Sequence, residues 1–480
     1  MNLWKQSACW IIAAGAASLW AVPLRAQQEG EEKPKPATRV LLPLPDLSGD
    51  QQDDSANHDP QNLKPDNGPL TGVQAPTLGF PDMRHSYWVP GIQFSNTVRS
   101  SPLIQSANSG WTSVSYAAGN LSLFQGWRSS SLRMDYSGGS YFSNDDVQGN
   151  GQFHQLALEY QINTRRWQLL FIEQFSYLPQ SSFGFGASTG LSSPGIGGSL
   201  GVPIPGLQGT YVPSQSNFAS VGSRYSSSSA AQLTYQVSAR TSVTLASVYG
   251  ILRFVEPGNI ESNNPNLTAG YNYVLSHKDT IGISYRFSVY QYLGIPQALG
   301  DHSAQLNYGR KITGRMALQL AAGPEITTYR IPIANRSQRN SVSGNATLTY
   351  AFKRSGVSVN YSHGVSGGGG ALVGSSADQV GVSANRQLTR VWQGNLNFSY
   401  AKNTGLTNLN GVSSPAYNSW YAGAGLNRPL GRETDFSIAY QAQNQNANLT
   451  SCSGPGCSTS YLVHQIILSF QWHTRPFVLR

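Results

Sequence analysis

From about residue 90 to the end of the chain, apolar residues alternate with small polar residues at every second position. Ile281, Ile283 and Tyr285, for example, alternate with Gly282 and Ser284. The same alternation recurs near residues 232–238, 346–352, 396–400 and 462–472. Side chains of an extended strand point to opposite faces in turn, so this period indicates strands with one apolar and one polar face. Such a chain folds into a sheet with two unlike surfaces.

Composition indicates which medium covers the apolar surface. Charged residues make up 11% of the 480 residues, against roughly 25% in soluble globular domains. The polar positions are mostly Ser, Thr, Asn, Gln and Gly, whereas an open soluble sheet normally protects its edges with charge. Aromatic residues, 11% of the chain, recur near segment ends, as in the girdles of transmembrane barrels. The mature chain has no run of about 18 apolar residues, which excludes a helical membrane protein.

The connections between strands alternate in length. Short turns are expected near residues 126–130, 163–166, 239–241, 277–279, 311–314, 353–355, 388–390 and 428–432. Longer stretches rich in Gly, Ser, Asn and Pro lie near residues 143–150, 179–225, 254–265, 292–301, 328–341, 365–377, 402–415 and 446–459. Short periplasmic turns alternating with long outer loops are typical of transmembrane β-barrels. Counting back from a last strand at 460–473 predicts an all-β fold: a transmembrane antiparallel up-and-down barrel of about 18 strands, with 16 as the alternative.

The N-terminal part of the chain differs from the barrel. Residues 1–26 have a basic start at Lys5, an apolar stretch and a small residue at Ala26, which indicates a secretory signal peptide. Residues 27–89 are acidic, rich in proline and without periodicity, so we expect a disordered periplasmic tail that either contacts a partner or is a solvated linker. Residues 90–480 form the barrel. In an exported chain, Cys452 and Cys457 around a Gly-Pro-Gly turn predict a disulfide, with a metal pair as the weaker alternative.

Over residues 90–480 the chain resembles the porin-like outer-membrane β-barrels of Gram-negative bacteria. The resemblance depends on the signal peptide, the alternating strands, the rhythm of turns and loops, and the apolar last strand. It implies location in the outer membrane and contact with outer-membrane lipids, lipopolysaccharide and the barrel-assembly machinery, and it leaves a homotrimer open. Polysaccharide-export porins are compatible with it. The chain ends in Arg480, whereas the family usually ends in an aromatic residue.

The polar face predicts a water-filled lumen, because a barrel of 16 to 18 strands is too wide for side chains to fill. Its neutral hydrogen-bonding groups suit hydrated solutes such as sugars. A few charged residues share the inward parity and are candidates for a constriction that selects the solute, or for pairs that stiffen the wall. These candidates are Arg133, Asp135, Glu159, Arg286, Glu325 and Asp435. The 179–225 segment is expected either to fold into the lumen and narrow it or to lie on the surface.

We therefore expect an outer-membrane pore for hydrophilic solutes or for an exported polysaccharide. The rival from another class is a non-conducting barrel that serves as a surface-binding or adhesion scaffold. A barrel phospholipase is a further alternative, because His154 and His464 lie on the apolar parity of their strands. Neither an enzyme nor a cofactor is expected, since no catalytic or metal-binding spacing is found. Nucleic acid is not an expected partner, because export separates the chain from it.

Overall fold

The computed structural model describes residues 77–78, 86–100, 111–144, 149–178, 207–208, 223–255, 260–333, 336–369, 372–406, 416–448 and 460–479. The predicted signal peptide, nearly all of the predicted tail and the predicted disulfide between Cys452 and Cys457 lie outside these residues. So do residues 179–206 and 209–222 of the long loop. Among the described residues, no helix is long and apolar enough to cross a bilayer.

The described chain consists of strands. They are β1 (Thr77–Leu78), β2 (Ser86–Ser100), β3 (Trp111–Gly126), β4 (Ser130–Ser143), β5 (Gly151–Asn163), β6 (Trp167–Leu178), β7 (Leu207–Gln208), β8 (Arg224–Ser238), β9 (Thr241–Phe254), β10 (Ser262–Val274), β11 (Asp279–Tyr292), β12 (Ala298–Thr313), β13 (Met316–Ile333), β14 (Arg336–Ala351), β15 (Ser355–Gly369), β16 (Leu372–Gln387), β17 (Gln393–Gly405), β18 (Ala416–Pro429), β19 (Thr434–Asn448), β20 (Ser460–His473) and β21 (Phe477–Leu479).

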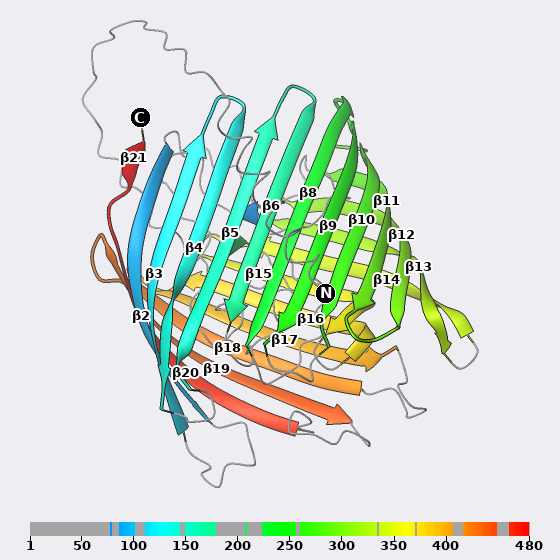
Figure 1. Ribbon diagram of the computed structural model, residues 1–480. Coiled ribbons are helices and arrows are strands. Elements are labelled where there is room, and N and C mark those ends of the chain that lie inside the picture. The colour runs from blue at the N-terminus through cyan, green and yellow to red at the C-terminus, as the bar shows by residue number, and fades with distance from the viewer. Residues whose placement is uncertain are drawn as a thin grey trace, which may run out of the picture. The chain divides into compact units, whose positions relative to one another are not determined.

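All of these strands except β1 and β7 form one closed antiparallel barrel (Figure 1). Strands β20 and β21 both pair with β2, along successive parts of its length, so the wall has 18 strand positions. The predicted barrel and its strand number are confirmed. Strands β1 and β7 pair with each other in a separate two-stranded sheet.

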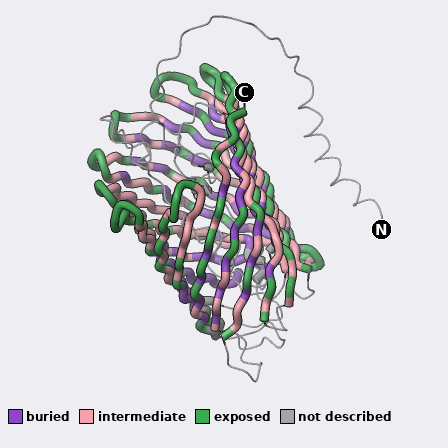
Figure 2. The backbone as a smooth tube through the Cα atoms, turned by 90° about the vertical axis from the view of Figure 1, so that its left-hand side faces the viewer, coloured by how far each residue is buried: buried purple, intermediate pink, exposed green. Residues whose placement is uncertain are grey.

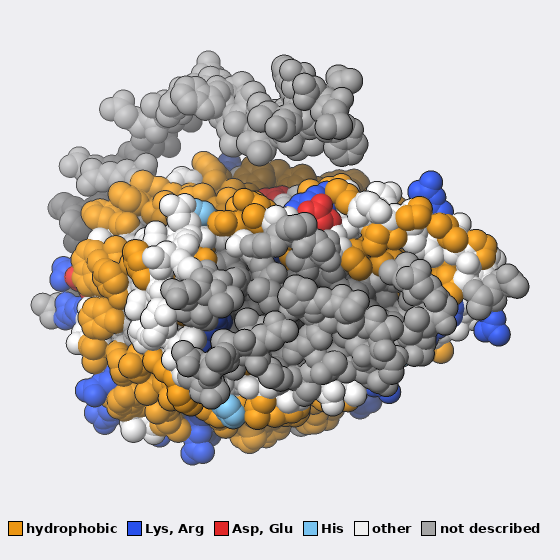
Figure 3. All heavy atoms as spheres, turned by 60° about the horizontal axis from the view of Figure 1, so that its bottom comes forward, with side chains coloured by type: hydrophobic (Ala, Val, Ile, Leu, Met, Phe, Trp, Pro, Cys, Tyr) orange, Lys and Arg blue, Asp and Glu red, His pale blue; other side chains and the backbone are white. Residues whose placement is uncertain are grey.

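The two faces of the wall carry the two kinds of side chain that the alternation predicts. Along β9, Ser242 and Thr244 are buried on the inside, whereas Val243 and Leu245 are exposed on the outside. Figure 2 shows this alternation of buried and exposed residues along the strands. Hydrophobic side chains cover much of the outer wall in Figure 3. A closed barrel with an apolar exterior is stable in a lipid bilayer, because its backbone groups are paired within the wall. In bacteria such barrels span the outer membrane.

The short turns lie at one end of the wall, where the sequence places them. The last strand residue before one such turn is Gly126, and the next strand begins at Ser130. At the other end, the long loops that the sequence predicts near residues 328–341 and 365–377 are wrong, because most of these residues are in strands. Strand β13 continues to Ile333, and β15 continues to Gly369. The glycines and serines of these stretches are extended because each stretch pairs with the following strand, as in the pair Ser366 and Ser375.

Candidate functional site in the barrel lumen

A buried charge cluster lies on the inner face of three neighbouring strands, β11, β12 and β13. Arg286 on β11 donates from Nη2 to Asp301 Oδ2 on β12 and to Glu325 Oε1 on β13, at 3.4 Å each. The two carboxylate side chains have no exposed surface, whereas the Arg286 side chain is 34% exposed. The carboxylates therefore hold the guanidinium, and the guanidinium is the part of the cluster open to the lumen.

The cluster is extended by hydroxyl groups on the adjoining strands. Ser341 Oγ on β14 donates to Glu325 Oε2 at 3.0 Å, and Thr327 Oγ1 lies 3.4 Å from Asp301 Oδ1. The parity of their strands predicts that Arg286 and Glu325 face inward, but the sequence does not predict Asp301, because it indicates a loop near residues 292–301. The alternation of Leu299, Asp301 and Ser303 was the signal that could have found it.

Arg133, Asp135 and Glu159 lie together elsewhere, on the inner face of β4 and β5. Arg133 is paired across the strands with Glu159, and its guanidinium lies 5.4 Å from the centre of the Phe124 ring. Asp135 is buried and accepts a hydrogen bond from Ser122 Oγ at 2.6 Å. As in the first cluster, both acidic residues are buried, and Arg133 is the more exposed member.

The two clusters lie on different parts of the wall and at different heights. Six barrel strands separate β4 from β12, namely β5, β6, β8, β9, β10 and β11. Arg133 lies three residues after the start of β4 at Ser130, and Arg286 lies seven residues after the start of β11 at Asp279. Four strand residues correspond to about 13 Å along a strand. The predicted candidates are therefore not brought together in one ring.

Asp435, the sixth candidate, lies apart from both clusters. It is the second residue of β19, at the short-turn end, and its Oδ2 lies 3.6 Å from His473 Nε2 on β20. Glu173 also lies apart from the clusters, on the outer face of β6, where Ser227 Oγ of β8 donates to its Oε1 at 2.8 Å. Within the described ranges, no group of three or more His, Cys, Asp or Glu could hold a metal ion.

Beyond Gly364, β15 leaves the ladder to β14, and Val365 to Gly369, together with Val373 and Gly374 of β16, lie against the inner face of the wall, while β16 stays paired with β17 as far as Ser375. Ladder pairs between β14 and β15 end at Gly344 and His363, although both strands continue. Beyond that point Val365 and Val373 pack with inward residues of the wall, in a cluster that also contains Tyr290, Tyr292, Leu299 and Leu406. We call these residues of β15 and β16 the inward hairpin. The sequence predicts a long loop near residues 365–377, which is wrong for Gly367 to Gly369, because they belong to β15, and Gly368 and Gly369 pair with β16.

The inward hairpin is hydrogen-bonded to the charge cluster and to two tyrosines. The backbone N–H of Val365 donates to Glu325 Oε1 at 3.2 Å. The Tyr290 hydroxyl donates to the Val365 carbonyl at 3.3 Å, and the Tyr292 hydroxyl donates to the Gly367 carbonyl at 2.5 Å. The hairpin and the Arg286 cluster therefore form one unit that narrows the lumen on the β11–β13 side.

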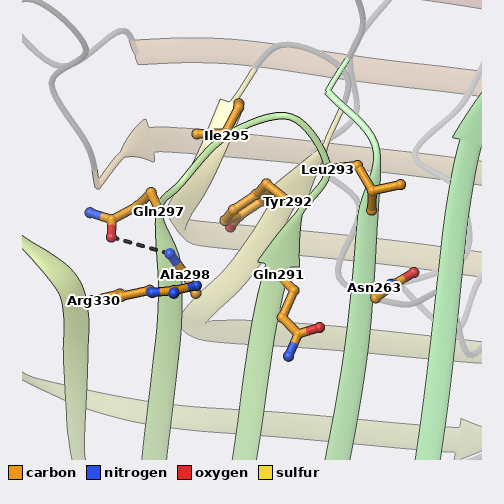
Figure 4. A pocket seen from close by; sticks show the side chains of 8 residues that line it. All are labelled: Asn263, Gln291, Tyr292, Leu293, Ile295, Gln297, Ala298 and Arg330. Atoms are coloured by element: carbon orange, nitrogen blue, oxygen red, sulfur yellow. Dashed lines mark hydrogen bonds between the residues drawn. The ribbon is translucent and has the colours of Figure 1, made fainter. Parts of the chain in front are cut away.

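A pocket of about 350 Å³ lies beside Tyr292, at the end of the wall where the longer connections lie (Figure 4). One of its edges is fixed by Gln297, whose Oε1 accepts from the backbone N–H of Ile331 at 2.9 Å and whose Nε2 donates to the Ile331 carbonyl at 3.0 Å. It is lined by Asn263, Gln291, Tyr292, Leu293, Ile295, Gln297, Ala298 and Arg330.

Away from the clusters, the inner wall is a network of neutral hydrogen bonds. Gln465 Nε2 donates to Gln441 Oε1 at 2.6 Å, and Asn307 Nδ2 donates to Ser284 Oγ at 2.9 Å. This lining is what the Ser, Thr, Asn and Gln of the polar parity predicted.

No protein-family model matches the sequence, and no curated protein matches it. Solved structures that align with the barrel include OpdQ of Pseudomonas aeruginosa, at 10% identity and a TM-score of 0.41, over 81% of this chain and 98% of that one. OccK5 (OpdH) of the same organism aligns at 11% identity and a TM-score of 0.42, over 81% and 98%. OccAB4 of Acinetobacter baumannii aligns at 9% and 0.41, over 82% and 99%. Values this low support no statement about the solute, and the fold assignment depends on the strand pairing of the chain itself.

Proposed function

We propose that this protein is an outer-membrane pore for the passive diffusion of small, uncharged hydrophilic solutes such as sugars. The observation that carries the proposal is a closed wall of 18 strand positions, apolar outside and hydrogen-bonding inside. A barrel of this size leaves an aqueous channel, and a neutral polar lining replaces water contacts without imposing a strong field.

The inward hairpin favours small solutes over an exported polysaccharide. It occupies part of the cross-section beside Tyr290, Tyr292 and Leu299, where a polymer would need clear passage. The geometry gives no support to a barrel phospholipase. The Nδ1 atoms of His154 and His464 are hydrogen-bonded to the hydroxyls of Tyr136 and Tyr440, at 2.9 and 2.8 Å.

Liposome swelling tests the proposal. Vesicles that contain the folded protein are diluted into isotonic solutions of neutral sugars of increasing size, and the swelling rate is followed by light scattering. We expect fast swelling with monosaccharides and a steep fall with longer oligosaccharides. Vesicles with the same protein inactivated by heat provide the baseline.

Absence of swelling with protein that shows the heat-modifiable mobility of a folded barrel would contradict the pore and favour the scaffold alternative. Equal permeation of long and short oligosaccharides would contradict the restriction to small solutes. It would return polysaccharide export to consideration.

A further inference from the structure

The outer part of β14 has an open edge. Residues Arg336 to Ser343 pair with β13 on one side, and the ladder to β15 on the other side ends at Gly344. In the described part of the chain, these backbone groups have no ladder partner on the β15 side. An unpaired strand edge is a template that readily accepts another strand.

The missing partner is the inward hairpin, because the register that stops at Gly344 and His363 can be continued. In the continued register, two residues beyond the last pair, Val342 would lie opposite Val365, and after two more Asn340 would lie opposite Gly367. The N–H and C=O of Val365 and the C=O of Gly367 are the groups that Glu325, Tyr290 and Tyr292 bind instead. The side chains of β11 and β13 therefore substitute for the β14 edge.

The sequence of β15 also fits the continued ladder. Tyr361 and His363 belong to the outward parity of β15, and Val365 is the next residue on that parity. Val342 is on the outward parity of β14 and is 60% exposed. If the ladder continued, two valines would face lipid side by side, as the wall requires, and Ser366 would face the lumen.

We propose that the inward hairpin is a gate with two hydrogen-bonded positions. In the closed position it lies on Tyr290, Tyr292 and Glu325, as in this structure. In the open position Val365 to Gly369 pair with the edge of β14, which completes the wall and widens the lumen. The inference rests on the proposed function, because a gate presupposes a pore.

Disulfide trapping tests the movement independently of conduction. In a background with Cys452→Ser and Cys457→Ser, the pair Val342→Cys/Val365→Cys lies in register only in the open position. We expect this pair to cross-link progressively in membranes under mild oxidation, as read by peptide mass spectrometry and reversed by reductant. The pair Leu348→Cys/Val359→Cys, which the ladder already joins, is the positive control. The pair Val342→Cys/Val359→Cys is out of register in both positions and is the negative control.

A second variant loosens the closed position. Tyr290→Phe with Tyr292→Phe removes two hydroxyl donors and keeps both rings, so the open-to-closed ratio should rise about fivefold for each lost hydrogen bond. We expect faster cross-linking of Val342→Cys/Val365→Cys and longer high-conductance openings in planar bilayers. Tyr271→Phe, a lipid-facing tyrosine on β10, serves as the matched control.

Cross-linking of Val342→Cys/Val365→Cys no higher than in the negative control would overturn the gate, whatever the conductance. A cross-linked pore with unchanged conductance would also overturn it. If the hairpin cross-links but neither the wild-type nor any variant conducts, the hairpin moves and the proposed pore is what fails.

Discussion

At the scale of single residues, Arg286 links the interior charges to the lumen. Its guanidinium is partly exposed, while Asp301 and Glu325 beneath it are not exposed. A solute in the lumen therefore contacts the Arg286 guanidinium first. The carboxylates of Asp301 and Glu325 fix the position of that guanidinium. Sequence parity predicts that Arg286 and Glu325 face inward. It could not show that they meet, because the contact depends on the relative register of β11, β12 and β13.

Replacing Arg286 should change the ion preference of the pore. In Arg286→Gln, the carboxylates of Asp301 and Glu325 lose their cation, so the lumen becomes more negative and cations should pass more readily than in the wild type. The reversal potential in a KCl gradient across a planar bilayer measures this shift. Arg310→Gln, at the short-turn end of β12, should leave the reversal potential unchanged. A shift toward anions in Arg286→Gln would contradict the placement of the cluster in the conducting path.

Gly323 permits a close approach of strands next to the cluster. A Cβ atom at this position would collide with the backbone carbonyl oxygen of Ala304 on β12. Gly323→Ala should therefore force β12 and β13 apart and lower the free energy of unfolding by about 1–3 kcal/mol. Urea unfolding in detergent micelles, followed by tryptophan fluorescence, gives the measurement. Gly119→Ala has open space around its added methyl group and should not be destabilised.

At the scale of elements, β15 has two parts with different surroundings. Its first half belongs to the wall and follows the alternation of the sequence, whereas its second half belongs to the inward hairpin. Residue alternation predicted the wall strands because each has one face toward lipid and one toward water. It could not predict the hairpin, since the bonds from Tyr290, Tyr292 and Glu325 come from strands far away in the sequence.

The assignment of faces can be tested on one strand. Leu306 on β12 is 63% exposed on the outer face, and the neighbouring Gln305 points inward. Leu306→Arg should lower the free energy of unfolding in lipid vesicles by about 2–4 kcal/mol, because it places a cation in the hydrocarbon layer. Gln305→Arg should cost at most about 1 kcal/mol, from the lost hydrogen bond to Ser343. Equal costs for the two variants would show that β12 does not face lipid on the Leu306 side.

At the scale of the whole molecule, the barrel is sealed by its first and last strands. Gln93 Nε2 on β2 donates to Ser469 Oγ on β20 at 2.8 Å, across a sequence separation of 376 residues. Among the described strands, every other pairing in the wall joins strands that are consecutive in the chain, apart from β6 with β8, which have β7 between them in the sequence, and β21 with β2. The strand count predicted from turns and loops depended on this closure, because only an even number brings the two ends together in antiparallel pairing.

A disulfide across the seam should form and stabilise the barrel. In the Cys452→Ser and Cys457→Ser background, Ser95→Cys with Ser469→Cys places two cysteines at paired positions. We expect spontaneous oxidation, and a gain in unfolding free energy of at most about 5 kcal/mol, because the bond closes a very long loop. Mobility on denaturing gels with and without reductant, followed by urea unfolding, measures both effects.

The control uses Ser437, which pairs with Ser469 but lies two strands from Ser95. Ser95→Cys with Ser437→Cys should not cross-link, because two strand spacings, about 10 Å, exceed the reach of a disulfide. Cross-linking in this control pair, with none between residues 95 and 469, would show that the wall closes in another register.

The seam between Gln93 and Ser469 also bears on biogenesis. The edge of β2 that pairs with β20 stays unpaired during synthesis until β20 has been made, because Gln93 and Ser469 are 376 residues apart in the chain. Until β20 has paired, the incomplete sheet has two unpaired strand edges in an aqueous compartment. Each edge can pair with another chain. A product truncated before β20 therefore cannot close its barrel, whatever number of strands it contains. It remains prone to aggregation because β20 is missing. We expect products that end before β20 to be degraded or bound by chaperones.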